Sequence, residues 1–339
     1  NIHTAAENSC PLAETLKDLS LDVEEKRMLY DELALQISGV PKTAYDLTGR
    51  QTERFRYDYT EPEDEAAELV SKLTVDQLVQ LAAGDPAKGQ GSQLGSAGIS
   101  VPGSAGQTSG CAEEEGIAEI VLADGPAGLR LNQHYTVRDG AIVPLPLEEA
   151  FERGFLYDGP KAEGTEYYQY CTAFPIGTLL AQSWDEELAA EVGSAAGDEM
   201  ERFGITLWLA PGMNIHRNPL CGRNFEYYSE DPLVSGRIAA AVTKGVQSHP
   251  GCGTTIKHFA CNNQEDNRMN SDSILSERTL REIYLRGFGI AVREAQPMSI
   301  MTSYNLINGI HSANNYDLCT KAARCEFGFK GVIMTDWGT

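Results

Sequence analysis

The sequence predicts an α/β fold, a (β/α)₈ barrel of the TIM type that is incomplete in this chain. Short apolar segments alternate with helix-length segments from residue 117 to the end, and alternation at this spacing is typical of parallel βα units. Polar residues gather where the predicted strands end, as they do at the active-site face of such barrels. No Gly-x-Gly-x-x-Gly follows the first predicted strand, which argues against a dinucleotide-binding fold.

Length and composition leave room for one large domain and a smaller lead-in. The chain has 339 residues, of which 42% are hydrophobic, enough for a sizeable core. We expect a helical lead-in or linker over residues 1–62 and the barrel over residues 63–339. Within the lead-in, residues 21–37 have the apolar spacing of a helix, and the polar segment 43–63 is predicted to lie as an arm over another surface.

The barrel elements are expected in a regular order. A helix over 64–83 precedes a Gly/Ser-rich loop that reaches residue 110, and a strand over 117–123 precedes an irregular insertion over 132–172. Six strands fall short of eight, so the barrel is expected to lack its last βα units. The remaining predicted strands are 174–180, 205–210, 254–260, 298–303 and 332–335, and the remaining helices are 185–203 with Asp185 as its N-cap, 232–247, 276–294 and 315–327.

The net charge of −22 excludes two classes of partner. A surface this acidic repels the phosphates of nucleic acids and of anionic membranes. The sequence contains no apolar run long enough to cross a membrane and no signal peptide. The chain begins with Asn rather than Met, so we expect that an upstream segment has been removed.

The eight cysteines are dispersed and form no Cys-x-x-Cys pair. This pattern suggests neither a zinc site nor a dithiol redox motif, and we expect no metal and no cofactor. Several cysteines, such as Cys261, lie within apolar runs, which favours buried free thiols. The protein is therefore expected in a reducing cytoplasm.

The last predicted strand ends in the segment Thr335-Asp336-Trp337-Gly338. A carboxylate at a barrel strand end can attack the anomeric carbon of a sugar, and an adjacent indole can stack on the apolar face of the sugar. The alternative is that Asp336 only caps the next turn.

The first predicted strand ends in Asp124-Gly-Pro-Ala-Gly-Leu-Arg130. Glycine and proline predict a tight turn that brings the acid and the base to the same rim. The carboxylate can accept bonds from two sugar hydroxyls, and the guanidinium can donate in a fork. A local ion pair across a structural turn is the alternative.

The loop after the strand predicted at 205–210 crowds charged and polar residues into residues 211–226. Such density is costly unless the groups pair with each other or with a ligand. A paired network could brace the rim, and Arg223 could at the same time reach a ligand while Glu226 or Glu230 orients an arginine.

Two further strand ends carry candidate sugar-binding groups. Lys257 and His258 are adjacent, so both reach a ligand only where the strand ends or is distorted; alternatively one is a satisfied core group, or Lys257 forms a Schiff base. Tyr304 could donate to the Asp336 carboxylate and, with Lys257 and Arg223, favour its charged form, or it could simply pack under a loop.

Taken together, these motifs resemble glycoside hydrolase family 3, in particular its β-glucosidase branch, over roughly residues 65–339. The resemblance implies a retaining mechanism that releases terminal non-reducing β-D-glucosyl residues, with Asp336 as the nucleophile that forms a covalent glycosyl-enzyme. It also implies that Trp337 lines the cleavage subsite and that the sugar is held there by Asp124, Arg130, Arg223, Lys257, His258 and Tyr304. The motifs that carry the resemblance are Asp124 to Arg130, Gly222-Arg223-Asn-Phe-Glu226, Lys257-His258-Phe259 with Asn263-Gln264-Glu265, Met301-Thr-Ser-Tyr304-Asn305, and Thr335-Asp336-Trp337.

The sequence departs from the family pattern in two ways. The branch that cleaves N-acetylglucosaminides has a Gly-His-Gly-Asp-Thr loop after Lys-His-Phe, whereas this chain has residues 260–264 as Ala-Cys-Asn-Asn-Gln, which disfavours that specificity. In the glucosidase branch the acid/base is a Glu on a separate sandwich domain, and Glu226, Glu230 and Glu265 are better explained as bracing groups. We therefore expect a second domain or chain to supply the acid/base. A sugar-binding subunit without catalysis is the alternative.

Overall fold

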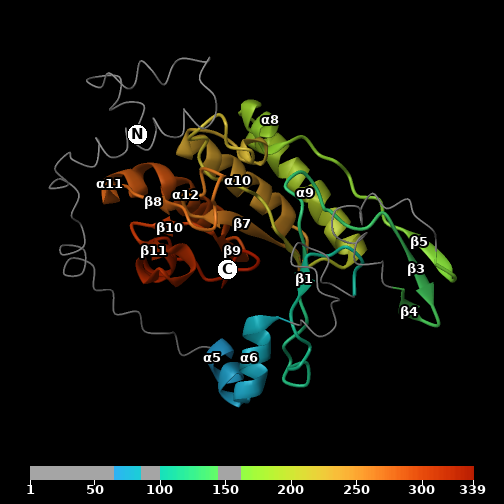
Figure 1. Ribbon diagram of the computed structural model, residues 1–339. Coiled ribbons are helices and arrows are strands. Elements are labelled where there is room, and N and C mark those ends of the chain that lie inside the picture. Colours follow the sequence, from blue (N-terminus) through green and yellow to red (C-terminus); the bar gives the residue numbers. More distant parts are fainter. Residues whose placement is uncertain (1–64, 85–99, 144–161) are drawn as a thin grey trace, which may run out of the picture. The chain divides into compact units, whose positions relative to one another are not determined.

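The computed structural model of the protein describes residues 65–84, 100–143 and 162–339 (Figure 1). The predicted lead-in over 1–62, its helix over 21–37 and its boundary with the barrel lie outside these residues. The main feature of the described part is a six-stranded sheet in the order β1-β2-β6-β7-β9-β12, in which every neighbouring pair is parallel except β1 and β2. Its strands are β1 (Gly106–Gln107), β2 (Val121–Ala123), β6 (Leu207–Trp208), β7 (Gly253–Phe259), β9 (Ser299–Thr302) and β12 (Val332–Met334).

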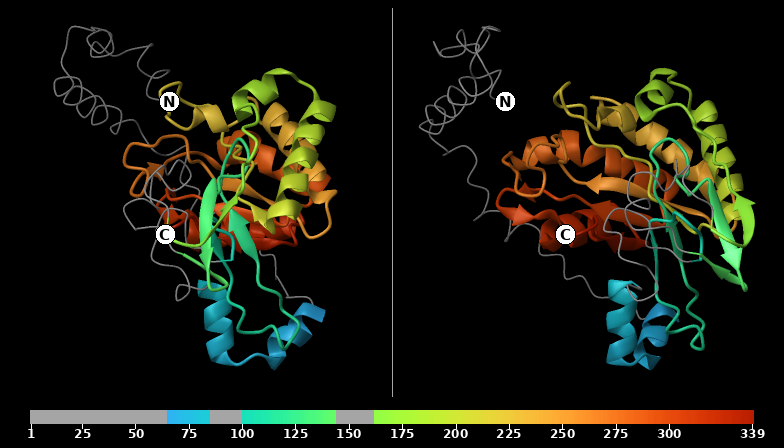
Figure 2. Two further views of the ribbon diagram at one scale, coloured as in Figure 1. Left: turned by 90° about the vertical axis from the view of Figure 1, so that its right-hand side faces the viewer. Right: turned by 45° about the vertical axis from the view of Figure 1, so that its right-hand side comes forward.

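The sheet is curved and open, with β1 and β12 as its two edges, so it forms part of a TIM-like barrel. This confirms the predicted fold class. Helices cover the outer face of the sheet, and α9, α10 and α12 lie side by side there in both views (Figures 1 and 2). The helical elements of this layer and its connections are α8 (Gly177–Gln182), α9 (Glu186–Phe203), η2 (Asn224–Glu226), α10 (Pro232–Gln247), α11 (Glu277–Thr279), η3 (Leu280–Tyr284), α12 (Arg286–Ala295), η4 (Ser312–Asn314) and η5 (Asp317–Glu326).

Buried apolar side chains fall into two clusters, one on each face of the sheet. The larger cluster fills the space between the sheet and the helices and includes Ile256, Phe288 and Ile300. The smaller one lies on the concave side and includes Leu207 and Met301. Every residue of β7 is buried, as expected for a central parallel strand that is covered on both faces. The smaller cluster is thus placed to form the base of a pocket at the ends of the strands.

Helix α9 begins where the sequence predicts it. The Asp185 carboxylate accepts hydrogen bonds from the backbone N–H groups of Glu187 and Leu188 at 2.9 and 3.0 Å, which confirms Asp185 as the N-cap. The helix ends at Gly204, which has a left-handed backbone conformation with φ of 73° that glycine adopts without steric cost.

Two of the predicted elements are wrong. Residues 174–180 were expected to form a strand, but they lead into α8, which buries Gly177, Leu180 and Ala181 on one side. A short apolar run does not distinguish a strand from a short helix. The helix expected over 64–83 is two helices, α5 (Glu65–Lys72) and α6 (Val75–Ala83).

The break between α5 and α6 has a local cause that the sequence does carry. Thr74 and Gln77 form a reciprocal capping box at the start of α6, and this pattern of Ser or Thr followed three residues later by Glu or Gln is typical of a helix start.

The insertion over 132–172 is also more ordered than predicted. Within it, β3 (His134–Arg138), β4 (Ala141–Ile142) and β5 (Thr165–Tyr168) form a separate three-stranded antiparallel sheet. These strands are mostly exposed or half-buried on both faces, so the alternation of apolar and polar residues that identifies a strand is weak. Strand β1 was missed because only two residues of the Gly/Ser-rich stretch pair with β2.

Close packing of α9 against α10 depends on glycine. A Cβ atom on Gly245 would lie 2.1 Å from the carbonyl oxygen of Ala190, and one on Gly193 would lie 2.2 Å from that of Val242. The two backbones therefore approach more closely than any side chain at these positions would allow. This contact fixes α9 against α10, and α10 in turn packs on the sheet and on α12.

We expect Gly245→Ala to lower the free energy of unfolding, by about 1–3 kcal/mol, because the added methyl group overpacks this contact. In an unconstrained helix interior the same change would be stabilising, by about 1 kcal/mol. Urea unfolding monitored by circular dichroism measures the difference. As a control, Ala195→Gly on the exposed face of α9 should lose only the usual propensity difference. An increase in stability for Gly245→Ala would show that the two backbones can separate to admit a side chain without cost.

Candidate active site

A pocket of about 250 Å³ opens at the carboxyl ends of the parallel strands. Residues that follow β2, β6, β7, β9 and β12 all contribute to it, as expected for a barrel active site. It contains all eight residues that the sequence singles out, so the structure brings every one of them to a single site. The lining residues are Ala105, Asp124, Arg130, Leu209, Arg223, Lys257, His258, Arg268, Met301, Tyr304, Asp336 and Trp337.

The turn after β2 places Asp124 and Arg130 together. Their side chains pair at 2.7 Å, and the Arg130 backbone N–H donates to the Asp124 carbonyl at 2.8 Å. The turn requires glycine at position 125, where φ is 127° and a Cβ would lie 2.0 Å from the carbonyl oxygen of Gly128. Asp124 and Arg130 therefore form an ion pair across a structural turn and also line the pocket. The structural and the ligand-binding interpretations of this motif are thus compatible.

Lys257 joins this group from the other side of β6. Its Nζ lies 2.9 Å from Asp124 Oδ1, and its side chain is only 4% exposed. Burial alone would raise the pKa of Asp124, but the positive charges of Lys257 and Arg130 outweigh burial and lower it to about 2. The Asp124 carboxylate is thus ionised at neutral pH.

An irregularity in β7 brings both Lys257 and His258 into the pocket. Ile256 pairs with Ile300 and Phe259 with Thr302, so β7 has one residue more than β9 between these pairs. Such a bulge interrupts the alternation of side chains along a strand. This fulfils the condition set by the sequence, under which two adjacent residues reach one ligand only if the strand is distorted.

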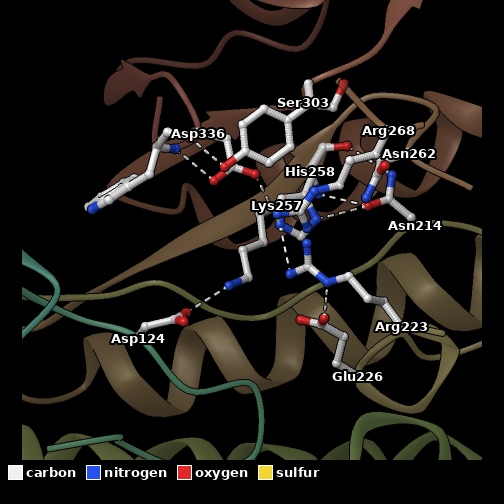
Figure 3. Close-up of polar contacts among 12 residues, drawn as sticks. Asp124, Asn214, Arg223, Glu226, Lys257, His258, Asn262, Arg268, Ser303 and Asp336 are labelled. Atoms are coloured by element: carbon white, nitrogen blue, oxygen red, sulfur yellow. Dashed lines mark hydrogen bonds and ion pairs between the residues drawn. The ribbon is translucent and has the colours of Figure 1, made fainter. Parts of the chain in front are cut away.

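His258 is buried and surrounded by hydrogen-bonding groups (Figure 3). Arg223 Nη2 lies 3.1 Å from His258 Nε2, and Asp336 Oδ2 lies 3.7 Å from the same nitrogen. Burial, followed by the charges of Arg223 and Lys257, lowers the pKa of His258 well below 6.5, so the ring is neutral. Arg223 in turn pairs with the buried Glu226 through its Nε, which is the bracing contact that the sequence suggests.

Asp336 follows β12 and is largely buried. Its Oδ1 accepts a hydrogen bond from the Trp337 backbone N–H at 2.8 Å. The Trp337 indole N–H donates to the Ala105 carbonyl at 3.1 Å, and the Tyr304 hydroxyl donates to the Trp337 carbonyl at 2.6 Å. These bonds fix the segment that carries the carboxylate against both β1 and β9.

The pKa of Asp336 is shifted upward from 3.8. Burial is the largest cause, and the Trp337 N–H, Lys257, Arg223 and a hydrogen bond from Tyr304 only partly offset it. Each of the three neighbours named from the sequence thus favours the charged form of Asp336, as expected, while burial acts in the opposite direction and is the larger effect. A poorly solvated carboxylate of raised pKa is more nucleophilic when it ionises.

Arg268 lines the pocket although no sequence pattern predicts it. It donates to Glu265 at 3.0 Å and lies over the Tyr304 ring at 4.7 Å from the ring centre. It belongs to a loop nine residues beyond the last residue of β7, so no strand end marks it. The candidate acids Glu226, Glu230 and Glu265 do not line the pocket; the first and third pair with arginines, and Glu230 is exposed.

The described part of the chain has neither a metal cluster nor a membrane-spanning helix. Across 65–84, 100–143 and 162–339, no three His, Cys, Asp or Glu residues are placed so that they could share a metal ion. In the same residues no helix combines the length and the apolar character needed to cross a bilayer. Cys261 is buried and free, as predicted.

Asp124 and Asp336 are expected to affect stability in opposite directions. Asp124→Asn leaves Lys257 buried without its partner and should cost about 3 kcal/mol at neutral pH. Because the folded pKa of Asp124 is lowered to about 2, its contribution is present above pH 3.8 and is lost as the pH falls toward 2. The difference in the free energy of unfolding between wild type and Asp124→Asn should therefore become smaller in acid.

Asp336→Asn should instead raise the stability at neutral pH. A raised folded pKa means that the contribution of Asp336 is present below pH 3.8 and is lost as the pH rises through the folded value. The amide keeps the acceptor for the Trp337 N–H. Urea unfolding of the two variants at neutral pH and at about pH 3 measures both effects, and destabilisation of similar size by both substitutions would contradict the opposite pKa shifts of the two carboxyls.

Comparison with known proteins agrees with this geometry. Beta-glucosidase A of Butyrivibrio fibrisolvens is 39% identical over 270 residues, 80% of this chain, and exo-alpha-(1->6)-L-arabinopyranosidase of Bifidobacterium breve is 43% identical over 226 residues, 67% of this chain. The chain spans 27% of the length of each of these curated relatives. The solved structure of beta-glucosidase 3B from Thermotoga neapolitana in complex with glucose aligns with a TM-score of 0.66 at 44% identity, over 81% of this chain and 34% of that one.

The family model described as Glycosyl hydrolase family 3 N terminal domain matches residues 160–339, which is more than half of the chain. The matched region contains four of the five strand ends that build the pocket, those of β6, β7, β9 and β12. The chain therefore belongs to glycosyl hydrolase family 3.

Proposed function

We propose that this chain binds the sugar and carries the nucleophile of a retaining β-glucosidase. Asp336 attacks the anomeric carbon of a terminal non-reducing β-D-glucosyl residue. The observation that carries the proposal is the convergence of residues from five strand ends on one pocket, with a buried carboxylate beside an indole. The β-glucosidases among the relatives support the same activity.

The chemistry proceeds in two steps. In the first, an Asp336 carboxylate oxygen forms a bond to the anomeric carbon while the bond to the leaving-group oxygen breaks, and a general acid protonates that oxygen. In the second, water attacks the glycosyl ester and the same group, now a base, takes a proton from the water. Trp337 would stack on the apolar face of the sugar during both steps.

The balance of charge around the pocket favours a neutral sugar. Every cation that lines the pocket is paired with a carboxylate, and one carboxylate, Asp124, serves both Arg130 and Lys257. An anionic sugar would have to compete with these carboxylates, whereas neutral hydroxyls can both donate to the carboxylates and accept from the cations. The pairs are Lys257 with Asp124, Arg223 with Glu226, and Arg268 with Glu265.

We infer that the general acid comes from a second domain or a partner chain. Among the described residues that line the pocket, the carboxyl groups are Asp124 and Asp336. With its pKa lowered to about 2, Asp124 carries no proton to donate at neutral pH. The acid must therefore lie about 5–5.5 Å from Asp336 on a part of the protein that the described residues do not include.

One alternative activity is opposed by the geometry of the site, and one alternative substrate is favoured by a relative. The Lys257 amine donates to Asp124 at 2.9 Å, which argues against a Schiff-base lyase because that chemistry needs an amine that is free to attack a carbonyl carbon. The arabinopyranosidase among the relatives favours pentopyranosides as second candidate substrates, since their rings offer the same stacking face.

We place the protein in a reducing cytoplasm on the basis of the free thiols at the seven described cysteines.

Incubation with 2-deoxy-2-fluoro-β-glucosyl fluoride should attach one fluorohexosyl group to Asp336. The fluoride leaves without protonation, so the reaction does not require the general acid. Intact mass spectrometry and peptide mapping detect the adduct, and Asp336→Asn, which retains the fold, should remain unlabelled. A folded protein that binds glucose but is never labelled would instead support the sugar-binding subunit without catalysis.

The rate of glycoside cleavage by this chain should depend steeply on the leaving group. 2,4-Dinitrophenyl β-glucoside needs little protonation and should react, whereas cellobiose should react slower by at least about 10²–10⁴-fold, the usual contribution of a general acid. Initial rates for a series of aryl glucosides give the slope, and the corresponding α-L-arabinopyranosides test the second sugar. An ordinary enzymatic rate on cellobiose would show that the acid lies within the chain.

A further inference from the structure

A layer of polar side chains lies directly behind the pocket, where it cannot touch the sugar. Its members are Tyr227, Asn262 and Glu265; none of them lines the pocket, and the first two are 0% and 2% exposed. Buried polar groups destabilise a protein unless they are hydrogen-bonded. The hydrogen-bond partners of these three side chains should therefore explain why they are buried here.

One end of the layer holds Arg268. Glu265 Oε2 accepts a hydrogen bond from Arg268 Nη1 at 3.0 Å, and this pair keeps the guanidinium over the Tyr304 ring. The second oxygen of Glu265 accepts from Asn262 Nδ2 at 3.2 Å. The Glu265 carboxylate is thus shared between Arg268, which lines the pocket, and Asn262, which does not.

The other end of the layer holds His258. Asn262 Nδ2 also donates to the Tyr227 hydroxyl at 3.1 Å, so that its two amide hydrogens serve Tyr227 and Glu265. The Tyr227 hydroxyl lies 3.1 Å from His258 Nδ1. A continuous path of hydrogen bonds therefore joins two pocket residues that do not follow each other in the chain.

The chemistry of Arg223 determines which nitrogen of His258 carries the proton. A guanidinium can only donate, and Arg223 Nη2 lies 3.1 Å from Nε2, so Nε2 is the acceptor. In the neutral ring the proton is then on Nδ1, where the Tyr227 hydroxyl at 3.1 Å and Asn214 Oδ1 at 3.3 Å can accept it.

We propose that Glu265, Asn262 and Tyr227 are positioning residues that orient Arg268 and His258 toward the sugar and keep Nε2 of His258 unprotonated, as the acceptor for Arg223. The proposed function supplies the identity of the sugar. The unprotonated Nε2 accepts the hydrogen bond from Arg223 Nη2, which fixes this guanidinium beside the pocket. It also leaves Asp336 Oδ2, 3.7 Å away, without a histidine donor that would weaken its nucleophilicity.

The tautomer of His258 can be measured without any substrate. In protein with ¹⁵N-labelled histidine, of which the chain has six, the wild type should show a neutral ring protonated on Nδ1. Loss of the signal in His258→Asn assigns the resonance. Tyr227→Phe removes one of the two acceptors and should increase the Nε2-protonated form. Tyr228→Phe is the matched control, because Tyr228 is the adjacent buried tyrosine and does not line the pocket.

The effect on sugar reactivity is measured with the same fluoroglucosyl fluoride. Tyr227→Phe and Glu265→Gln should each lower the maximal labelling rate about tenfold, since small misplacements of reacting groups have effects of this order. Tyr228→Phe and Glu230→Gln, an exposed acid outside the pocket, should label at the wild-type rate. In the double variant the two losses should not be additive, because Asn262 is hydrogen-bonded to both residues and couples them.

The outcomes separate this inference from the proposed function. A wild type that is never labelled refutes the proposed function, and the tautomer measurement still tests the layer. A wild-type His258 protonated on Nε2, or variants at 227 and 265 that match their controls in both measurements, would overturn the inference. Thermal unfolding confirms that each variant is folded, and if Tyr227→Phe is not, the labelling rate of Glu265→Gln decides.

Discussion

The arrangement of the pocket depends on the ion pair between Lys257 and Asp124. Lys257 lies near the carboxyl end of β7 and Asp124 follows β2. These two strands are separated in the sheet by β6, so the pair joins strands that do not share backbone hydrogen bonds. Charges this deeply placed are tolerated because each has a partner. The same condition governs the rest of the rim, where Arg223 and Arg268 reach the pocket only with Glu226 and Glu265 behind them.

Much of the site was predictable from the sequence because barrel chemistry follows a simple rule. A buried parallel strand reads as an apolar run, and the polar residues directly after it face the active site. Asp124 and Asp336 satisfy that rule, whereas Lys257 lies within β7 beside the irregularity between Ile256 and Phe259. Arg268 does not, because it lies in a loop whose path is set by contacts with Glu265 and the Tyr304 ring, and neither contact leaves a periodic pattern.

The incorrect predictions share another cause. Helix α8 and the small sheet β3–β4–β5 are short elements with exposed sides, where the contrast between apolar and polar positions that identifies secondary structure is small. The net pKa shift of Asp336 is a different case, because the sequence alone did not predict it. The sequence identifies the charged neighbours of this carboxyl, but its desolvation depends on every element that covers it, and desolvation is the larger effect.

The position of β12 has a consequence for the motions of the molecule. Within the described sheet β12 pairs only with β9, and Val332 on it is 53% exposed. Edge strands held by one neighbour open locally at lower free energy than central strands. Within the described sheet, the position of the carboxylate at the end of β12 therefore depends on the hydrogen bonds that Trp337 makes with Ala105 and Tyr304 as well as on the pairing with β9.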